Sequence, residues 1–223
     1  MNQLASNEAK ITFKNPIQVR RSKNSHVYYV WSPKRGKTIS LYGQLSQYYW
    51  IVLESSPTVS YFCERAFRLP IEGKKIIASF WAEGSTNQFI FLAGKKQKDK
   101  LIDTISQCKA FIDFCADRLI QINVLTEADI KMTASYYQNW QTILQQVAAN
   151  KEEISYDLQQ NVYDYFQQYH ACSLGQIFAL FEVDPVIIRA TVFELIRQHK
   201  LTYRDEDSAP INDTTIIDWN PQC

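Results

Sequence analysis

Two clusters of basic residues are the side chains of this sequence best suited to binding a polyanion. The first cluster is interleaved with Tyr28, Tyr29 and Trp31 and consists of Arg20, Arg21, Lys23, Lys34, Arg35 and Lys37. The second consists of Lys95, Lys96, Lys98 and Lys100. Lysine and arginine contact DNA phosphates without regard to base sequence. Either cluster alone is usually a solvated surface, whereas the two together predict contact with DNA.

The uneven distribution of charge limits this prediction to the N-terminal part. Residues 1–40 carry eight Lys and Arg against one acidic residue, Glu8, although the whole chain has a net charge of only +1. Residues 151–223 carry five Lys and Arg against twelve acidic residues. The beginning of the chain should therefore attract polyanions, and its end should repel them.

Neither the cysteines nor the histidines form a pattern typical of a metal site. The five cysteines are scattered and include no C-x-x-C pair, at Cys63, Cys108, Cys115, Cys172 and Cys223. They indicate neither a disulfide framework nor a zinc ribbon. His170-x-Cys172 has no companion ligands, so it favours an ordinary loop and core position.

The composition is that of a folded protein without a membrane segment. A hydrophobic fraction of 46% in 223 residues supplies enough apolar surface for a core. No run approaches the ~20 apolar residues of a membrane span, and residues 1–14 lack the apolar segment of a secretory signal. We therefore expect a cytoplasmic protein that does not contact a membrane.

The elements expected within residues 1–150 alternate between strands and helices, which is typical of an α/β fold. A strand over 26–31 precedes a basic turn at 32–37. We then expect a helix over 42–54, a strand over 59–69, a hairpin of 76–82 and 89–93 with its turn at 83–87, a helix over 98–118, a strand over 119–125 and a helix over 127–149. Residues 150–153 are the expected linker.

Residues 151–223 predict a small winged-helix domain. Helices are expected over 156–168, over 174–181 with Ser173 as its cap, and over 185–199 with Asp184 as its cap. Two strand-like segments, 201–204 and 215–219, then enclose a polar loop. Three helices followed by such a pair of strands are typical of a helix-turn-helix that closes with a wing.

The charge of this domain argues against DNA as its target. A recognition helix normally presents several basic or amide side chains to the groove. The third helix offers Arg189, Arg197 and His199 alongside Glu194, within an acidic segment. We therefore expect the domain to dock a protein partner.

Several motifs between residues 45 and 93 resemble a known family. They are Trp50-Ile-Val-Leu-Glu54, Pro57-Thr-Val-Ser-Tyr61, Cys63-Glu-Arg-Ala-Phe-Arg-Leu69, Ser79-Phe80-Trp81 and Gln88-Phe-Ile-Phe-Leu-Ala93. Together with the wing-like tail 205–217, they resemble the TnsA-like endonucleases, which act with a separate transposase in heteromeric transposition systems. The likeness covers residues 15–219. It implies a restriction-endonuclease-like (PD-(D/E)xK) domain with a basic N-terminal arm at 1–150 and a winged helix at 151–223.

The departures from the family pattern fall on its catalytic positions. The position of the family's helical glutamate matches Ser46, and that of the hairpin aspartate matches Ser79. The lysine position matches Gly94 or, with a slip of one residue, Lys95. Magnesium-dependent phosphodiester hydrolysis requires anionic oxygens to hold the metal and a cation beside the attacking water, and serine hydroxyls carry no charge. The resemblance therefore implies a nuclease fold without its catalytic carboxylates.

We accordingly expect a nuclease-inactive subunit that binds DNA non-specifically and requires no cofactor. The resemblance implies a transposase subunit and an ATPase regulator as partners, and it leaves self-association open. One alternative is an active endonuclease that uses Mg²⁺ and displaced carboxylates at Glu54, Glu64 or Glu83, residues whose ordinary interpretation is solvated surface. The other is a winged-helix adaptor or regulator in which the nuclease-like part serves only as a dimer surface.

Overall fold

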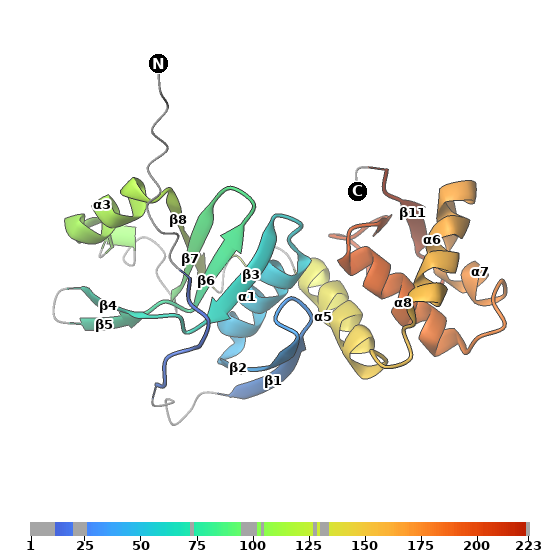
Figure 1. Cartoon of the computed structure of the whole chain (residues 1–223), viewed down its shortest axis with the longest axis horizontal. Coiled ribbons are helices and arrows are strands. Elements are labelled where there is room, and N and C mark those ends of the chain that lie inside the picture. Colours follow the sequence, from blue (N-terminus) through green and yellow to red (C-terminus); the bar gives the residue numbers. More distant parts are fainter. Residues whose placement is uncertain are drawn as a thin grey trace, which may run out of the picture.

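The computed structural model describes residues 12–19, 26–71, 74–94, 102–103, 105–126, 129 and 134–221. Its first part contains, in chain order, β1 (Val27–Ser32), β2 (Lys37–Tyr42), α1 (Gln44–Ser55), β3 (Val59–Glu64), β4 (Arg68–Ile71), β5 (Lys74–Ile77), β6 (Phe80–Gly84), β7 (Gln88–Gly94), α3 (Lys109–Asp117), β8 (Ile120–Thr126) and α5 (Ala134–Ala149). This mixture of strands and helices confirms the expected α/β class. Figure 1 shows α5 leading from this part to a second, mainly helical part.

Four of the described strands form a mixed sheet at the centre of the first part, in the order β3-β6-β7-β8. Strand β6 is antiparallel to both β3 and β7, whereas β7 and β8 are parallel, with Gln88 opposite Ile120 and Gly94 opposite Thr126. Parallel neighbours require a crossover connection, and α3 lies within it. Strands β1 and β2 form a separate antiparallel hairpin.

Helix α1 packs against this sheet and carries several residues of the candidate site. Its apolar side chains follow the helical period, and Tyr49, Trp50 and Leu53 are buried. The Tyr49 hydroxyl donates to the Leu92 carbonyl at 2.5 Å and accepts from the Leu125 amide, which ties the helix to β7 and β8. The observed bounds agree closely with the predicted helix over 42–54.

The strand predicted over 59–69 is divided in two. Arg65 adopts a left-handed backbone conformation, with φ 45°, and β3 ends directly before it. The chain then continues into β4, which pairs with β5 in a hairpin outside the central sheet. The strand predicted over 76–82 is divided at Ala78 and Ser79, because β5 belongs to that hairpin and β6 belongs to the central sheet.

The turn between β6 and β7 is shorter than the predicted 83–87. Glu83 pairs with Gln88 in the strand ladder, so it lies in β6 and the turn comprises 85–87. Gly84 makes a close approach to the loop before β3, since a Cβ at this position would lie 2.7 Å from the Thr58 carbonyl oxygen. A larger residue here would displace that loop.

The helix predicted over 98–118 is interrupted. A turn at Gln107 and Cys108 separates α3 from the helical residues 102–103 and 105–106, and residues 98–101 and 104 lie outside the described part of the chain. The description of α5 begins at Ala134, and residues 127–128 and 130–133 of its predicted range are likewise outside.

The second part of the chain combines helices with a small antiparallel sheet. Its described elements are α6 (Tyr156–Tyr169), β9 (Ala171–Ser173), α7 (Leu174–Phe178), α8 (Pro185–Arg197), β10 (Leu201–Tyr203) and β11 (Ile216–Trp219). The sheet has the order β10-β11-β9. Strand β9 is only three residues long and was not predicted from the sequence.

The predicted helix caps in this part are confirmed. Ser173 forms a capping box with Gln176, and the Asp184 carboxylate accepts a hydrogen bond from the Val186 amide beside Pro185. These contacts satisfy amide groups that have no partner inside the helix. Helix α7 ends at Phe178, earlier than the predicted 181.

Helix α5 joins the two parts, because it contacts both α1 and α8. Buried Asn139 donates hydrogen bonds to the carbonyls of Glu206 and Ala209 and accepts one from the Ile211 amide. The indole of Trp140 donates to the Glu206 carboxylate at 2.5 Å. The loop between β10 and β11 is therefore fastened to a helix of the first part.

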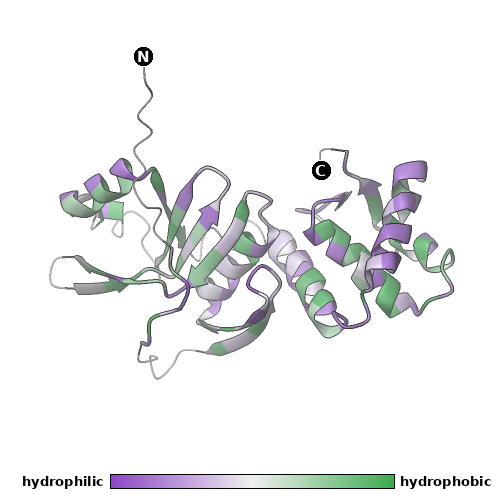
Figure 2. Ribbon diagram, in the orientation of Figure 1, coloured by the Kyte–Doolittle hydropathy of each residue, from purple (hydrophilic) through white to green (hydrophobic). Residues whose placement is uncertain are grey.

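The larger of two apolar clusters among the described residues extends through both parts. It includes Ile39 of β2, Trp140 of α5 and Ile217 of β11. Figure 2 shows apolar residues along the central strands and along α8, which contribute to this core. Burial of apolar surface is the main driving force of folding, so the two parts stabilise one another. Among the described helices, none combines the length and the apolar character needed to span a bilayer.

Candidate functional site

Ser46 and Ser79, which are far apart in the sequence, line one cavity. Ser46 lies in the first turn of α1, and Ser79 lies in the break between β5 and β6. The cavity has a volume of about 170 Å³ and is lined by Val19, Leu41, Tyr42, Ser46, Glu64, Arg65, Ile77, Ser79 and Phe80. The Ser46 hydroxyl donates to the Tyr42 carbonyl at 2.9 Å. The start of α1, the end of β3 and the start of β6 thus converge at this cavity.

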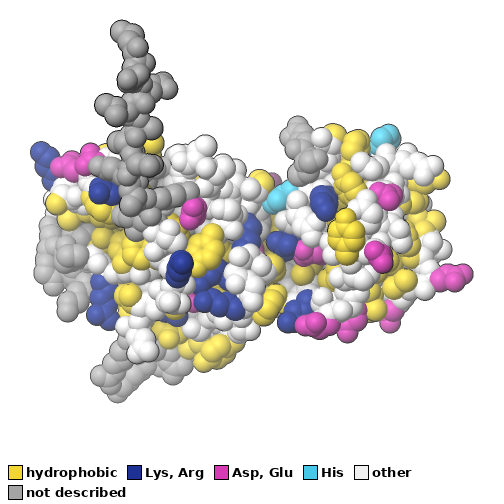
Figure 3. Space-filling model, in the orientation of Figure 1, with side chains coloured by type: hydrophobic (Ala, Val, Ile, Leu, Met, Phe, Trp, Pro, Cys, Tyr) yellow, Lys and Arg dark blue, Asp and Glu magenta, His cyan; other side chains and the backbone are white. Residues whose placement is uncertain are grey.

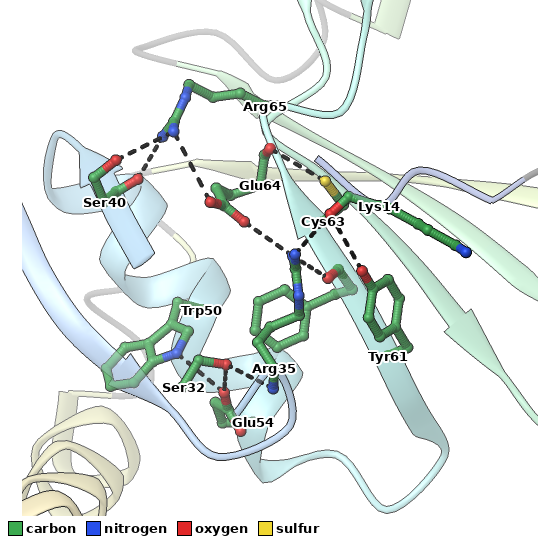
Figure 4. Close-up of polar contacts among 11 residues, drawn as sticks. Lys14, Ser32, Arg35, Ser40, Trp50, Glu54, Tyr61, Cys63, Glu64 and Arg65 are labelled. Carbon is green, nitrogen blue, oxygen red and sulfur yellow. Dashed lines mark hydrogen bonds and ion pairs between the residues drawn. The ribbon is translucent and has the colours of Figure 1, made fainter. Parts of the chain in front are cut away.

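The carboxylate at the cavity belongs to Glu64, the last residue of β3. Glu64 is only 4% exposed, so its interpretation as solvated surface is wrong. One carboxylate oxygen lies 3.1 Å from the Arg35 guanidinium, and the other lies 3.9 Å from the Arg65 guanidinium. Figure 4 shows Glu64 between these two arginines.

Arg65 is held in place by contacts on two sides. Its guanidinium donates to the Ser40 carbonyl, donates to the Ser40 hydroxyl at 3.2 Å and lies 4.4 Å from the centre of the Tyr42 ring. The left-handed backbone at this residue directs the side chain toward β2, the strand that carries both partners. A cation over an aromatic face is attracted by the ring quadrupole, which further restricts the side chain.

The electrostatic balance around the cavity favours an anion. Two guanidinium groups lie within 4 Å of the single carboxylate, so its charge is already neutralised. Hard divalent cations are held by several anionic oxygens, whereas Ser46 and Ser79 contribute neutral hydroxyls. Across the described residues, no group of three or more His, Cys, Asp or Glu could hold a metal ion. The residues present are therefore better suited to binding an anion than a divalent cation.

Comparison with known proteins does not identify a family for this chain. No protein-family model matches the chain, and no curated protein does. The likeness to TnsA-like endonucleases therefore rests on the sequence motifs alone. Gly94, one match for the family's lysine, is the last residue of β7, and Lys95 lies outside the described residues.

Glu54 is buried in α1 and serves the structure of the basic turn. It is 0% exposed, so its interpretation as solvated surface is also wrong. Its carboxylate accepts hydrogen bonds from the Ser32 hydroxyl and from the Trp50 indole at 3.3 Å, as Figure 4 shows. It also accepts one from the Lys34 amide at 3.3 Å. Burial raises the pKa of Glu54, against the opposing effects of Ser32 and Lys34.

Lys34 and Arg35, both predicted DNA contacts, are turned inward. The Lys34 ammonium donates to the Leu53 carbonyl and to the Ser56 carbonyl, each at 2.6 Å, and so caps the end of α1. Its burial lowers the pKa to about 8. The Arg35 side chain is 2% exposed and donates to the Phe62 carbonyl at 2.6 Å as well as to Glu64. Neither charge is available to a DNA phosphate in this arrangement.

The other predicted DNA contacts have different outcomes. Lys37, the last basic residue of the turn, is exposed. The remaining predicted contacts lie outside the described residues, namely Arg20, Arg21, Lys23, Lys95, Lys96 and Lys98. Their proposed contact with DNA therefore stays a prediction.

An open groove beside the cavity contains the exposed basic residues. It has a volume of about 500 Å³ and is lined by Thr12, Lys14, Arg35, Lys37, Ser60, Tyr61 and Glu83. Arg35 connects groove and cavity, since its guanidinium donates to the Lys14 carbonyl at 2.9 Å and to Glu64. Figure 3 shows Lys and Arg side chains over the sheet-containing part, on the face in view.

Lys14 is one of the basic residues of the N-terminal part, and its place in the site was not predicted from the sequence. Lys14 lies outside the interleaved cluster, and only the fold places it in the same groove as Lys37. The Tyr61 hydroxyl donates to the Lys14 carbonyl at 3.4 Å, and the Arg35 guanidinium lies 4.7 Å from the centre of the Tyr61 ring. Arg35 and Tyr61 thus position the segment that carries Lys14.

Proposed function

We propose that this chain is a TnsA-like, nuclease-inactive subunit that binds DNA without sequence preference and docks protein partners of a transposition complex. The observation that carries this proposal is the meeting of Ser46 and Ser79 at one cavity. Their assignment to the family's glutamate and aspartate positions came from motifs alone, and catalytic carboxylates must converge to share a metal. If this assignment were incorrect, nothing would require Ser46 and Ser79 to line the same cavity.

The order of elements also supports a restriction-endonuclease-like fold. The basic turn 33–36 precedes α1, and β3 and the β6–β7 hairpin follow, with the β4–β5 hairpin between them. The resemblance implies a basic turn, a helix with the glutamate position, a strand and a hairpin in this succession, and Ser79 directly precedes the first strand of the β6–β7 hairpin. The inactive state follows from chemistry, because two hydroxyls replace two carboxylates and the nearby Glu64 is neutralised by arginine.

Absence of nuclease activity is tested with supercoiled plasmid. The purified chain, incubated with Mg²⁺ or Mn²⁺, is expected to produce no more nicked plasmid than buffer does, because the site has too few anionic oxygens for a metal. Agarose electrophoresis separates the nicked from the supercoiled form. Metal-dependent nicking that is lost in Glu83→Ala or Glu64→Gln would instead support the active endonuclease with displaced carboxylates.

DNA binding is attributed to the open groove. Lys14 and Lys37 are exposed and line the groove together with Arg35 and one carboxylate, Glu83. Such residues bind phosphates by releasing counterions, which makes affinity dependent on salt rather than on base sequence. The groove therefore suits non-specific binding of the DNA backbone.

Replacing Lys14 and Lys37 together with alanine is expected to weaken binding to a random duplex by about tenfold. The slope of log K against log salt should decrease by roughly two, because two phosphate contacts are lost. Gel shifts over a series of salt concentrations measure both quantities. Lys109→Ala, an exposed lysine on α3, is the matched control. Equal losses in the control and in the double variant would contradict a role for the groove.

For the second part, we propose a winged helix that docks a protein. The succession α6, β9, α7, α8, β10 and β11, with the 204–215 loop as the wing, supports this fold. Arg189 pairs with Asp213 at 2.7 Å and Arg197 pairs with Glu194 at 2.6 Å, so both arginines of α8 are already neutralised. DNA phosphates would have to compete with these carboxylates.

Exposed apolar side chains around the α7–α8 turn support the docking role. Leu180 and Val186 are 50% and 49% exposed, and Val183 is 36% exposed. The exposed acidic residues Glu182 and Asp184 lie between them in the sequence. Apolar patches with a polar rim commonly mark protein interaction sites. The resemblance suggests a transposase subunit or an ATPase regulator as the partner.

A further inference from the structure

The cavity at Ser46 and Ser79 has the chemistry of a phosphate site built around Arg65. We propose that it binds one phosphate group of the DNA backbone, with the Arg65 guanidinium supplying the positive charge that a metal ion would supply in a nuclease. This proposal rests on the proposed function for its choice of DNA as the source of the phosphate. The cavity itself is defined by its own residues.

The Arg65 guanidinium is fixed in place while most of its donors stay available. It carries five N–H groups, and two of them donate to the carbonyl and hydroxyl of Ser40. Within the described part of the chain, the others have no hydrogen-bond acceptor. Because the Ser40 contacts and the Tyr42 ring already order the side chain, binding an anion would require little further ordering.

The backbone of Arg65 is strained, and its conformation directs the guanidinium to the wall of the cavity. A φ of 45° lies in the left-handed region, which is unfavourable for a residue with a long side chain. Glycine or asparagine would adopt this conformation more easily. Such strain tends to occur at functional sites, and here it directs a cation to the wall of a cavity.

The other groups at the cavity complement an anion. Gly43 precedes α1 without a side-chain cap, and its neighbours Tyr42 and Ser46 line the cavity, so the positive end of the helix borders it. Glu64 opposes an anion, but it lies between Arg35 and Arg65, which leaves a net positive charge. The volume of about 170 Å³ far exceeds the roughly 10–15 Å³ that one water requires.

Arg35 connects this site to the groove to which DNA binding is attributed. Tyr42, Ser46, Arg65 and Ser79 are half-buried rather than enclosed, so solvent reaches the cavity. Arg35 touches Glu64 at the cavity and Lys14 at the groove. A DNA strand that contacts Lys14 and Lys37 would therefore pass close to the cavity. The oxygens of one of its phosphates can then accept hydrogen bonds from the Arg65 guanidinium, in the charge-assisted geometry typical of arginine.

Two different substitutions test the site, so that the test does not fail if one of the variants does not fold. Arg65→Asn removes the guanidinium but suits the left-handed backbone. Ser79→Asp introduces a negative charge that opposes an anion, and neutral Ser79→Asn should lose clearly less binding than Ser79→Asp. Arg204→Asn, at an arginine that is 61% exposed in the second part, is the matched loss of one surface charge. Thermal unfolding of every variant verifies that it is folded.

The first measurement uses inorganic phosphate as the probe. Isothermal titration at constant ionic strength, with chloride as the reference, should detect phosphate binding to the wild type and to Arg204→Asn. Arg65→Asn and Ser79→Asp should each weaken it by about tenfold or more, since each removes or opposes a charge-assisted hydrogen bond. Equal phosphate binding by all folded variants would overturn the site.

The second measurement uses a short duplex of random sequence. Arg65→Asn and Ser79→Asp should lower DNA affinity by about tenfold, with a smaller change in Arg204→Asn. DNA binding that is the same in all variants would overturn the DNA-backbone assignment while leaving non-specific binding intact. Conversely, phosphate binding that depends on Arg65, in a chain that binds no DNA, would support an anion site and refute the proposed function.

Discussion

Replacing Arg35 with alanine is expected to lower the free energy of unfolding by about 3–5 kcal/mol, the range observed when one partner of a buried ion pair is removed. The side chains of Arg35 and Glu64 are 2% and 5% exposed, so the variant would leave the Glu64 carboxylate buried beside only the more distant Arg65. It would also remove the donor to the Phe62 and Lys14 carbonyls. Denaturant unfolding monitored by tryptophan fluorescence measures the loss.

Lys37→Ala is the matched control for this experiment. Lys37 lies two residues away in the same basic turn, but it is exposed, so its loss should change stability by less than about 0.5 kcal/mol. The two variants should therefore differ in their effects. Arg35→Ala should lower stability, whereas Lys37→Ala should lower DNA affinity. An Arg35→Ala variant of normal stability and reduced DNA affinity would show that Arg35 contacts phosphate directly, as the sequence pattern alone suggests.

The inward orientation of Arg35 illustrates what a charge pattern leaves undetermined. Within the turn, Lys34, Arg35 and Lys37 are indistinguishable by type, and all three suggest a solvated basic surface. Their orientations depend on acceptors that are distant in the sequence, such as the Glu64 carboxylate and the carbonyls at the end of α1. A single sequence does not identify such partners, because ion pairing is a property of tertiary structure.

Local patterns predicted the elements that depend on local physics. The apolar period of α1 and the caps at Ser173 and Asp184 needed only neighbouring residues, and the structure agrees with them. The division of the predicted strands did not follow from local pattern, since it depends on a left-handed Arg65 and on the pairing of β4 with β5. Strand propensity is similar on both sides of that break.

The candidate site was only partly accessible from the sequence. Ser46 and Ser79 were singled out by family resemblance, and no spacing rule would have paired them. Arg65, which supplies the charge at their cavity, was part of a quoted motif but received no role. Its function depends on its contacts with Ser40 and Tyr42 in a neighbouring hairpin. The arginine therefore became interpretable only when the fold was known.

Substituting Glu54 should produce the second large effect. Glu54→Ala removes the acceptor shared by the buried Ser32 hydroxyl, the buried Trp50 indole and the part-buried Lys34 amide. Each unsatisfied donor costs about 1–3 kcal/mol, so a total loss of about 3–5 kcal/mol is expected. Glu54→Gln retains one carbonyl oxygen and should lose less, although its amide would face the Lys34 N–H.

The pH dependence of the Glu54→Gln comparison tests the electrostatics of this carboxyl. Burial raises the pKa of Glu54 above 4.5, its value in the unfolded chain. The folded state therefore holds the proton more tightly, and its stability relative to the non-titrating Glu54→Gln is greatest below pH 4.5 and falls as the pH rises through the folded-state pKa. The free energy of unfolding is measured for both proteins between pH 4.5 and 8. Its difference cancels the contributions of the other carboxylates, which the two proteins share. If the wild type instead gains stability over Glu54→Gln as the pH rises, pairing with Lys34 outweighs burial, and the charged carboxylate is the form that the fold selects.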